Sequence, residues 1–192
     1  MNLPNRLTVG RLFLTALFVL CFYLPWGHAM TAALLIFSLA SITDWLDGRI
    51  ARARNLVTHF GKLFDPLADK VLIAAAFILL VENTKMKAWI AIAILGREFF
   101  VTGIRLIAAQ QGVVLAAERL GKHKMFWQIL TVLYFLLEAA SREWLFSFLR
   151  PWYESTALQT RVGFALVAVT TFLTLLSGLT YFWRNRRLFD DA

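Results

Sequence analysis

Residues 44–69 read DWLDGRIARARNLVTHFGKLFDPLAD. Four of the six aspartates in the chain, Asp44, Asp47, Asp65 and Asp69, lie in this stretch, and the other two belong to the last three residues. If the stretch forms two helices joined by a hairpin, the first two aspartates share one helical face and the last two share another. Four carboxylates brought together repel one another unless cations neutralise them. The spacing therefore predicts a site for two divalent metal ions.

The composition of the whole chain is that of a polytopic membrane protein. Of its 192 residues, 59% are hydrophobic and only 17% are charged, which is too apolar for an ordinary soluble domain. The formal net charge is +8. Because the basic residues gather between apolar segments, we interpret them as contacts with anionic lipid headgroups and expect no nucleic-acid partner. A single membrane domain over residues 1–192 is expected.

Apolar segments recur along the chain, and the second and third are each near the roughly 20 residues that a bilayer requires. We expect an all-α protein with a short interfacial helix within residues 1–11 and six transmembrane helices, at about 12–24, from 29 into the acidic motif, and at 62–81, 87–109, 125–140 and 160–183. Residues 141–159 are amphipathic and are expected to lie on the membrane surface. Lys and Arg concentrate on the side that holds both termini and the acidic motif, so that side is expected to be cytoplasmic.

Charged residues inside the fourth apolar segment predict a functional site, because such residues are costly in lipid. Arg97, Glu98 and Arg105 lie there. Glu98 and Arg105 are seven residues apart on nearly the same helical face and could form an ion pair, whereas the arginines could instead bind an anionic group. The segment before the fifth span carries Lys122 and Lys124, which we interpret either as membrane-surface anchors or as phosphate ligands.

The acidic motif resembles the signature of the CDP-alcohol phosphotransferase family. The resemblance covers all eight fixed positions of the signature: Asp44, Asp47, Gly48, Ala51, Arg52, Gly61, Asp65 and Asp69. It implies transfer of a phosphatidyl group from CDP-diacylglycerol to an alcohol, with release of CMP. Two Mg²⁺ or Mn²⁺ ions are implied as cofactors, and a homodimer embedded among membrane lipids is implied as the assembly.

The resemblance also implies a role for each motif position. The implied metal ligands are Asp44, Asp47, Asp65 and Asp69, the last of which would also act as the general base. The residues implied to contact CDP-diacylglycerol are Asp44, Gly48, Ala51, Arg52 and Gly61.

Three further patterns are similar to the branch of this family that uses glycerol 3-phosphate as acceptor. They are Asn5-x2-Thr8-x2-Arg11, the run GREFFVTGIR that begins at Gly96, and Gly121-Lys122-x-Lys124, which is followed by Met125 where relatives often have threonine. This similarity implies that the acceptor phosphate is held by Arg97, Arg105, Lys122 and Lys124. It also implies a bacterial cytoplasmic (inner) membrane protein whose site faces the cytoplasm.

Two alternatives stay open at this point. The same reaction could use another acceptor, namely inositol phosphate, serine or phosphatidylglycerol, because such relatives share the aspartate signature. A small metal-cation transporter could also hold buried carboxylates, although it would not need the spacing of Gly48, Ala51 and Arg52.

Overall fold

A computed structural model of the chain describes the backbone of residues 3–54, 59–110, 112–113, 115, 119–154 and 156–186. Side chains are described for the same residues except 3–8, 44–54, 59–69, 119, 122 and 156–159. The described part contains helices and no strand. In chain order the elements are α1 (Leu3–Cys21), α2 (Ala29–Arg54), α3 (His59–Glu82), α4 (Ala88–Gln110), α5 (Arg119–Ala140), the 3₁₀ helix η1 (Trp144–Leu149), α6 (Arg150–Glu154) and α7 (Thr156–Asn185).

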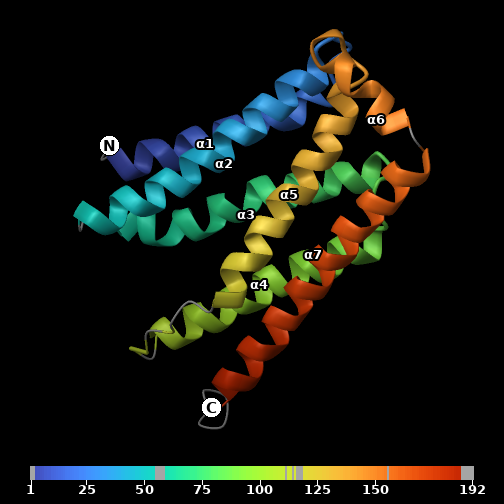
Figure 1. The fold of residues 1–192 in the computed structure, drawn as a ribbon. Coiled ribbons are helices and arrows are strands. Elements are labelled where there is room, and N and C mark those ends of the chain that lie inside the picture. The colour runs from blue at the N-terminus through green and yellow to red at the C-terminus, as the bar shows by residue number, and fades with distance from the viewer. Residues whose placement is uncertain are drawn as a thin grey trace.

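The six long helices run alternately between two ends of a bundle (Figure 1). One end holds the starts of α1, α3 and α5 and the final turns of α2, α4 and α7; we call it the motif end, because the acidic motif falls there. The opposite end holds the α1–α2 and α3–α4 turns together with η1 and α6. Helix α1 packs against α2 and α3, α2 packs against α5, and α7 packs against α4 and α5.

The main hydrophobic core lies between α1, α2, α3 and α5. Phe18, Phe37, Phe77 and Leu136, one from each of these helices, are almost completely buried. The rings of Phe18 and Phe37 have centroids 5.5 Å apart, a separation at which aromatic pairs attract. Small buried residues pack beside them, namely Ala33, Ala40, Ala76 and Ala140. Their size lets the helix backbones approach closely, which is how helices associate where lipid removes the hydrophobic driving force.

Hydroxyl groups join α5 to α7. Thr131 and Thr170 share a hydrogen bond of 2.8 Å between their Oγ1 atoms, and Thr170 also donates to the carbonyl oxygen of Trp127 at 3.1 Å. Both threonines are completely buried. Such contacts between apolar helices contribute about 1 kcal/mol each, and they fix the register of α7 on α5.

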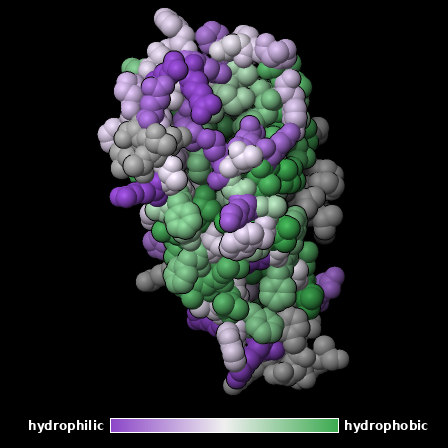
Figure 2. Space-filling view, turned by 90° about the vertical axis from the view of Figure 1, so that its right-hand side faces the viewer, coloured by the Kyte–Doolittle hydropathy of each residue, from purple (hydrophilic) through white to green (hydrophobic). Residues whose placement is uncertain are grey.

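Apolar surface and helix length agree with a membrane setting. Among the described residues, one segment, Thr160–Asn185, is by itself long and apolar enough to cross a bilayer, and Val9–Cys21 and Ala29–Thr43 are shorter apolar helices. On the face shown in Figure 2, hydrophobic residues dominate the middle, whereas hydrophilic residues gather toward the upper end and again at the lower tip.

The helix boundaries confirm that most of the expected segments are helical, with two differences in where the helices begin. Helix α1 runs without interruption from Leu3 to Cys21, so the short separate helix expected within residues 1–11 is absent from the described part. Helix α5 begins at Arg119, six residues before the expected start at 125. The basic segment that holds Lys124 is therefore the first part of a helix and not a loop.

Helices α3 and α4 end with the same hydrogen-bonding pattern but with different residues. After α3 the amide of Lys85 donates to the carbonyl of Leu80, and the amide of Thr84 donates to that of Val81. After α4 the amide of Val113 donates to the carbonyl of Ala108, and the amide of Gly112 donates to that of Ala109. Gly112 has φ +75°, which suits glycine, whereas Thr84 has φ +58°. This left-handed conformation costs a β-branched residue about 1–2 kcal/mol.

A distant carboxylate caps the start of α2. Glu143, which follows α5, accepts hydrogen bonds from the backbone amides of Met30 at 2.7 Å and Thr31 at 2.8 Å. These amides lie in the first turn of α2, where the helix has no internal acceptor for them and where its dipole favours a negative charge. Glu143 thus joins two helices that are more than a hundred residues apart in sequence.

We expect Glu143→Ala to lower the free energy of unfolding by about 2 kcal/mol, because two amides lose a charged acceptor. For a chain of this length the thermal midpoint should fall by roughly 4–8 °C in detergent. The matched control is Glu154→Ala, since Glu154 pairs with Arg150 on the surface at 2.6 Å and exposed pairs contribute little. Equal midpoints for the two variants would contradict the role given to Glu143.

Candidate functional site

The two halves of the acidic motif lie at the same end of the bundle. Asp44 and Asp47 belong to the second half of α2, Asp65 and Asp69 belong to the first half of α3, and four residues join the two helices. The helical backbone expected for both halves is confirmed. The side chains of the four aspartates, and those of Gly48, Ala51, Arg52 and Gly61, lie outside the described part, so their expected meeting in one pocket stays a prediction.

A polar cluster lies inside the bundle at the motif end. It is built by three helices that converge there, α4, α5 and α7, and its members are Arg97, Glu98, Lys124, Gln128, Thr174 and Ser177. We call it the Glu98 cluster. Its side chains sit among apolar helices, where an isolated charge would be costly, so each charge needs partners from neighbouring helices.

Glu98 is the centre of this cluster. Its Oε1 accepts from the ammonium of Lys124, from Nε2 of Gln128 at 3.2 Å and from Nη1 of Arg97 at 3.5 Å. The side chains of Lys124 and Arg97 are each 9% exposed and that of Glu98 is 12% exposed. Among the described side chains, one carboxylate therefore balances two cations. An arginine and a lysine held side by side are groups of the kind that can hydrogen-bond to an anion such as a phosphate.

Helix α7 fixes the position of Arg97. The Nη2 atom of Arg97 donates to Oγ of Ser177 at 2.7 Å. A Cβ placed on Gly178 would lie 2.6 Å from Cγ of Arg97, which is closer than real contacts of this kind. Gly178 is therefore needed so that the side chain of Arg97 can pass along α7.

Arg105 does not belong to the Glu98 cluster. It lies about two turns further along α4, where its Nε donates to the hydroxyl of Tyr181 at 3.2 Å and its guanidinium carbon lies 5.3 Å from the centre of the same ring. The possible ion pair between Glu98 and Arg105 does not form, because Glu98 contacts Arg97, Lys124 and Gln128, whereas Arg105 contacts Tyr181. Lys122 has a helical backbone in α5, and its side chain lies outside the described part.

The Glu98 cluster lies next to the second half of the acidic motif. Lys70 directly follows Asp69 in α3, and its charge is close enough to repel that of Lys124. Helices α3 and α5 are also in contact. Lys124 is buried, so the interpretation of this residue as a membrane-surface anchor is wrong. An anion bound at Lys124 would thus lie at the same end of the bundle as the aspartates.

Several residues of the site were missed from the sequence. Glu98 is contacted by Gln128, and Arg97 is contacted by Ser177 and Gly178. Arg105 is contacted by Tyr181. A signal was present for Gln128, because an amide inside an apolar segment needs a polar partner. Gly178 had no such signal, since its role depends on the path of a side chain from another helix.

The fold and the site define a helical, membrane-associated protein with an acidic motif beside a buried cationic cluster. The sequence model of the CDP-alcohol phosphatidyltransferase family matches residues 1–184, and the chain belongs to this family.

Curated relatives are similar over nearly the whole chain. The CDP-diacylglycerol–glycerol-3-phosphate 3-phosphatidyltransferase of Bacillus subtilis is 42% identical, over 96% of this chain and 95% of its own length. The proteins of the same name from Rickettsia felis and Shigella flexneri are 36% and 37% identical, over 98% and 94% of this chain and over 97% and 92% of their own lengths.

Proposed function

We propose that this chain transfers the phosphatidyl group of CDP-diacylglycerol to glycerol 3-phosphate, giving phosphatidylglycerophosphate and CMP in phospholipid biosynthesis. The observation that carries the proposal is the convergence of Arg97 and Lys124 on Glu98 beside the aspartate motif. An acceptor that carries its own phosphate needs such a cationic site next to the reacting centre. The names of the curated relatives support the same acceptor.

In this reaction a hydroxyl oxygen of glycerol 3-phosphate forms a bond to the lipid-linked phosphorus of CDP-diacylglycerol. The bond from that phosphorus to the bridging oxygen breaks, and CMP leaves with the electron pair. The hydroxyl proton passes to a base, a role that we assign to Asp69. A carboxylate can accept this proton only as the new bond forms, because a free hydroxyl is a far weaker acid than a carboxylic acid.

The four motif aspartates fit two divalent ions. Carboxylate oxygens are the donors that Mg²⁺ and Mn²⁺ prefer, and both pairs are carried by helix segments at one end of the bundle. Asp44, Asp47, Asp65 and Asp69 would hold the ions, which when bound would neutralise the diphosphate and stabilise the leaving CMP.

The remaining motif residues would bind the nucleotide lipid. Arg52 would hold the diphosphate or the cytidine end by hydrogen bonds from its guanidinium, and Asp44 would also contact the nucleotide lipid. Gly48, Ala51 and Gly61 would leave room for the nucleotide between α2 and α3, because they have little or no side chain.

Arg97 and Lys124 would hold the acceptor phosphate, and Arg105 and Lys122 would contribute from the same end of the bundle. The two arginines have different contacts, because Arg97 contacts Glu98 whereas Arg105 contacts Tyr181. We therefore expect Arg105 to contribute less than Arg97 to acceptor binding.

We expect Lys124→Gln to raise the KM for glycerol 3-phosphate by about 10- to 100-fold, the effect of losing one charged hydrogen bond. The KM for CDP-diacylglycerol should change less than about threefold. Arg186→Gln is a suitable control, because Arg186 lies near the same end but stacks on Trp183. An equal rise in both KM values for Lys124→Gln would instead indicate a structural role.

For the membrane arrangement we propose that α1, α2, α3, α4, α5 and α7 each cross the bilayer, with the motif end and both termini in the cytoplasm. The concentration of Lys and Arg at that end supports this orientation. At the opposite end, Trp144 and Trp152 of η1 and α6 are exposed, as suits the headgroup region. The location in a bacterial inner membrane and the homodimer stay predictions.

An acceptor screen tests the choice of substrate. Purified protein with CDP-diacylglycerol and Mg²⁺ is offered glycerol 3-phosphate, inositol phosphate, serine or phosphatidylglycerol, and CMP release is measured. Of these four acceptors, we expect only glycerol 3-phosphate to give rapid release of CMP. Preference for another acceptor would keep the family chemistry and overturn the proposed substrate, whereas absence of CMP with every acceptor would favour the cation transporter.

A further inference from the structure

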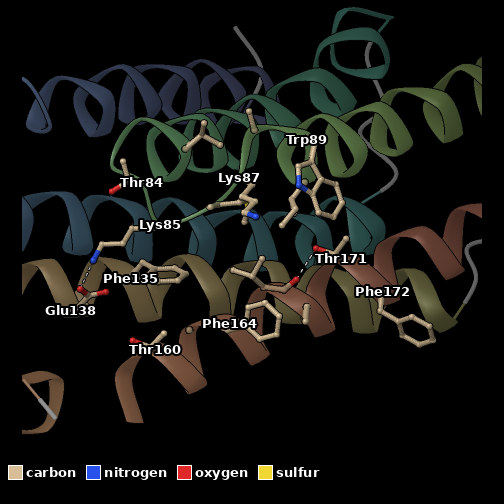
Figure 3. A pocket seen from close by; sticks show the side chains of 17 residues that line it. Thr84, Lys85, Lys87, Trp89, Phe135, Glu138, Thr160, Phe164, Thr171 and Phe172 are labelled. Carbon is tan, nitrogen blue, oxygen red and sulfur yellow. Dashed lines mark hydrogen bonds and ion pairs between the residues drawn. The ribbon is translucent and has the colours of Figure 1, made fainter. Parts of the chain in front are cut away.

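A cavity lies at the opposite end of the bundle from the acidic motif. It has a volume of about 970 Å³ and is bounded by the α3–α4 turn, α5 and α7. Figure 3 shows Lys87 and Trp89 on one side of it and Phe164 and Phe172 of α7 on the other. The volume is at the upper end of the range of about 300–1,000 Å³ found for ligand pockets.

The cavity is separate from the site described above. Val81 lines it from the last turn of α3, whereas Asp69 lies twelve residues earlier, about 18 Å along the same helix. No member of the Glu98 cluster is among the residues that line it. A ligand in this cavity would therefore not occupy the proposed catalytic centre.

The walls of the cavity are apolar and its mouth is basic. Phe135, Phe164 and Val167 form part of the wall, and the charged residues among its described lining are Lys85, Lys87 and Glu138. Glu138 is 2% exposed and pairs with Lys85, while Nη2 of Arg142 lies 3.8 Å from the same carboxylate oxygen. Lys87 is exposed, and Lys85 and Lys87 together exceed the charge of Glu138.

The basic mouth is held by the strained turn after α3. Thr84, with φ +58°, lines the cavity and precedes Lys85, and the turn is closed by the hydrogen bond from the Lys85 amide to Leu80. Glycine adopts this conformation without strain, as Gly112 does after α4. Stability alone would therefore favour glycine at position 84, where the chain has threonine. Strained residues of this kind gather at binding sites.

We propose that this cavity binds one anionic phospholipid, with an acyl chain along the wall formed by α5 and α7 and its phosphate at Lys87, assisted by Lys85. The exposed indole of Trp89 lies at the mouth, at the level where lipid headgroups meet apolar chains. Anionic charge is favoured by the two lysines, and the apolar wall suits a hydrocarbon chain. The inference rests on the proposed membrane embedding and not on the proposed acceptor.

A second copy of the chain fits the same surface less well. In a symmetric contact both copies would present the same patch, so the lysines of both would be brought into one interface away from water. A single lipid would instead pair the same lysines with its phosphate and cover the apolar wall with its acyl chain.

The test is a lipid titration of the purified full chain in detergent, followed by native mass spectrometry. Phosphatidylglycerol is compared with phosphatidylcholine of the same acyl chains. We expect one phosphatidylglycerol to bind in preference, Lys87→Gln to weaken that binding about fivefold, and Ala168→Trp, which fills the cavity wall, to remove it. The controls are Arg150→Gln, at the same end but paired with Glu154, and Leu35→Trp, on an exposed part of α2.

Equal binding of the two lipids by the unaltered protein would overturn the proposal, as would unchanged binding in both Lys87→Gln and Ala168→Trp. A shift from dimer to monomer in Ala168→Trp, with the same number of bound lipids, would assign the cavity to a contact between copies. CMP release by the same samples is measured in parallel, because failure of the proposed enzyme activity would leave the lipid count unaffected.

Discussion

Asp44→Asn, Asp47→Asn and Asp65→Asn are each expected to abolish CMP release. Each change removes one negative charge from a site that we propose to hold two divalent cations, and an amide oxygen is a much weaker ligand for such ions than a carboxylate. The rate is measured with saturating CDP-diacylglycerol, glycerol 3-phosphate and Mg²⁺. The positions of these residues in α2 and α3 put all three at the motif end of the bundle.

The matched control is Asp191→Asn, the same chemical change in an aspartate near the end of the chain and outside the motif. It should keep full activity. EDTA should stop the reaction of the unaltered protein, and added Mg²⁺ or Mn²⁺ should restore it. Substantial turnover by any one motif variant with an unchanged thermal midpoint would contradict its assignment as a metal ligand.

Asp69→Asn is expected to separate binding from chemistry. Asparagine keeps the shape of the side chain and one oxygen for a metal ion, but it cannot accept the proton of the acceptor hydroxyl. CDP-diacylglycerol should therefore bind almost normally, while the single-turnover rate falls by roughly 10²–10⁴-fold, the range for loss of a general base. Affinity for the nucleotide lipid and the single-turnover rate are measured on the same preparation.

Two other results would change the role of Asp69. Loss of CDP-diacylglycerol binding would make it chiefly a metal ligand, as proposed for Asp65 one turn earlier. A rate near that of the unaltered protein would leave it with neither role.

The helical segments could be predicted because each apolar run is long and is flanked by charged or turn residues. The starts expected at 29 and 87 agree with α2 and α4 to within one residue. The start of α5 could not be placed in the same way. Basic residues normally mark the end of a membrane span, but here the basic residues from Arg119 to Lys124 belong to the helix, and Lys124 turns inward to Glu98.

The interactions inside the site were harder to predict than the residues themselves. The sequence singles out Arg97 because charges in apolar segments are rarely without a role, and the structure brings it together with Lys124 at Glu98. Helical spacing also allows a pair between Glu98 and Arg105, because it reports only on neighbours along one helix, and this pair does not form. The helices that face Glu98 and Arg105 are set by the packing of α4 beside α5 and α7.

Contacts between distant segments gave no sequence signal at all. Glu143 caps α2 across more than a hundred residues, and nothing in its local sequence indicates this role. The same holds for Gly178, which is required by the path of Arg97. Both depend on how whole helices are placed.

The most direct test of the proposed function follows both products of one reaction. Purified protein in micelles with CDP-diacylglycerol and Mg²⁺ is given radiolabelled glycerol 3-phosphate, and CMP and lipid-extractable label are counted together. We predict that the two appear in equal amounts and that omission of glycerol 3-phosphate abolishes both. CMP release without label entering the lipid, or no release of CMP at all, would contradict the proposed transfer.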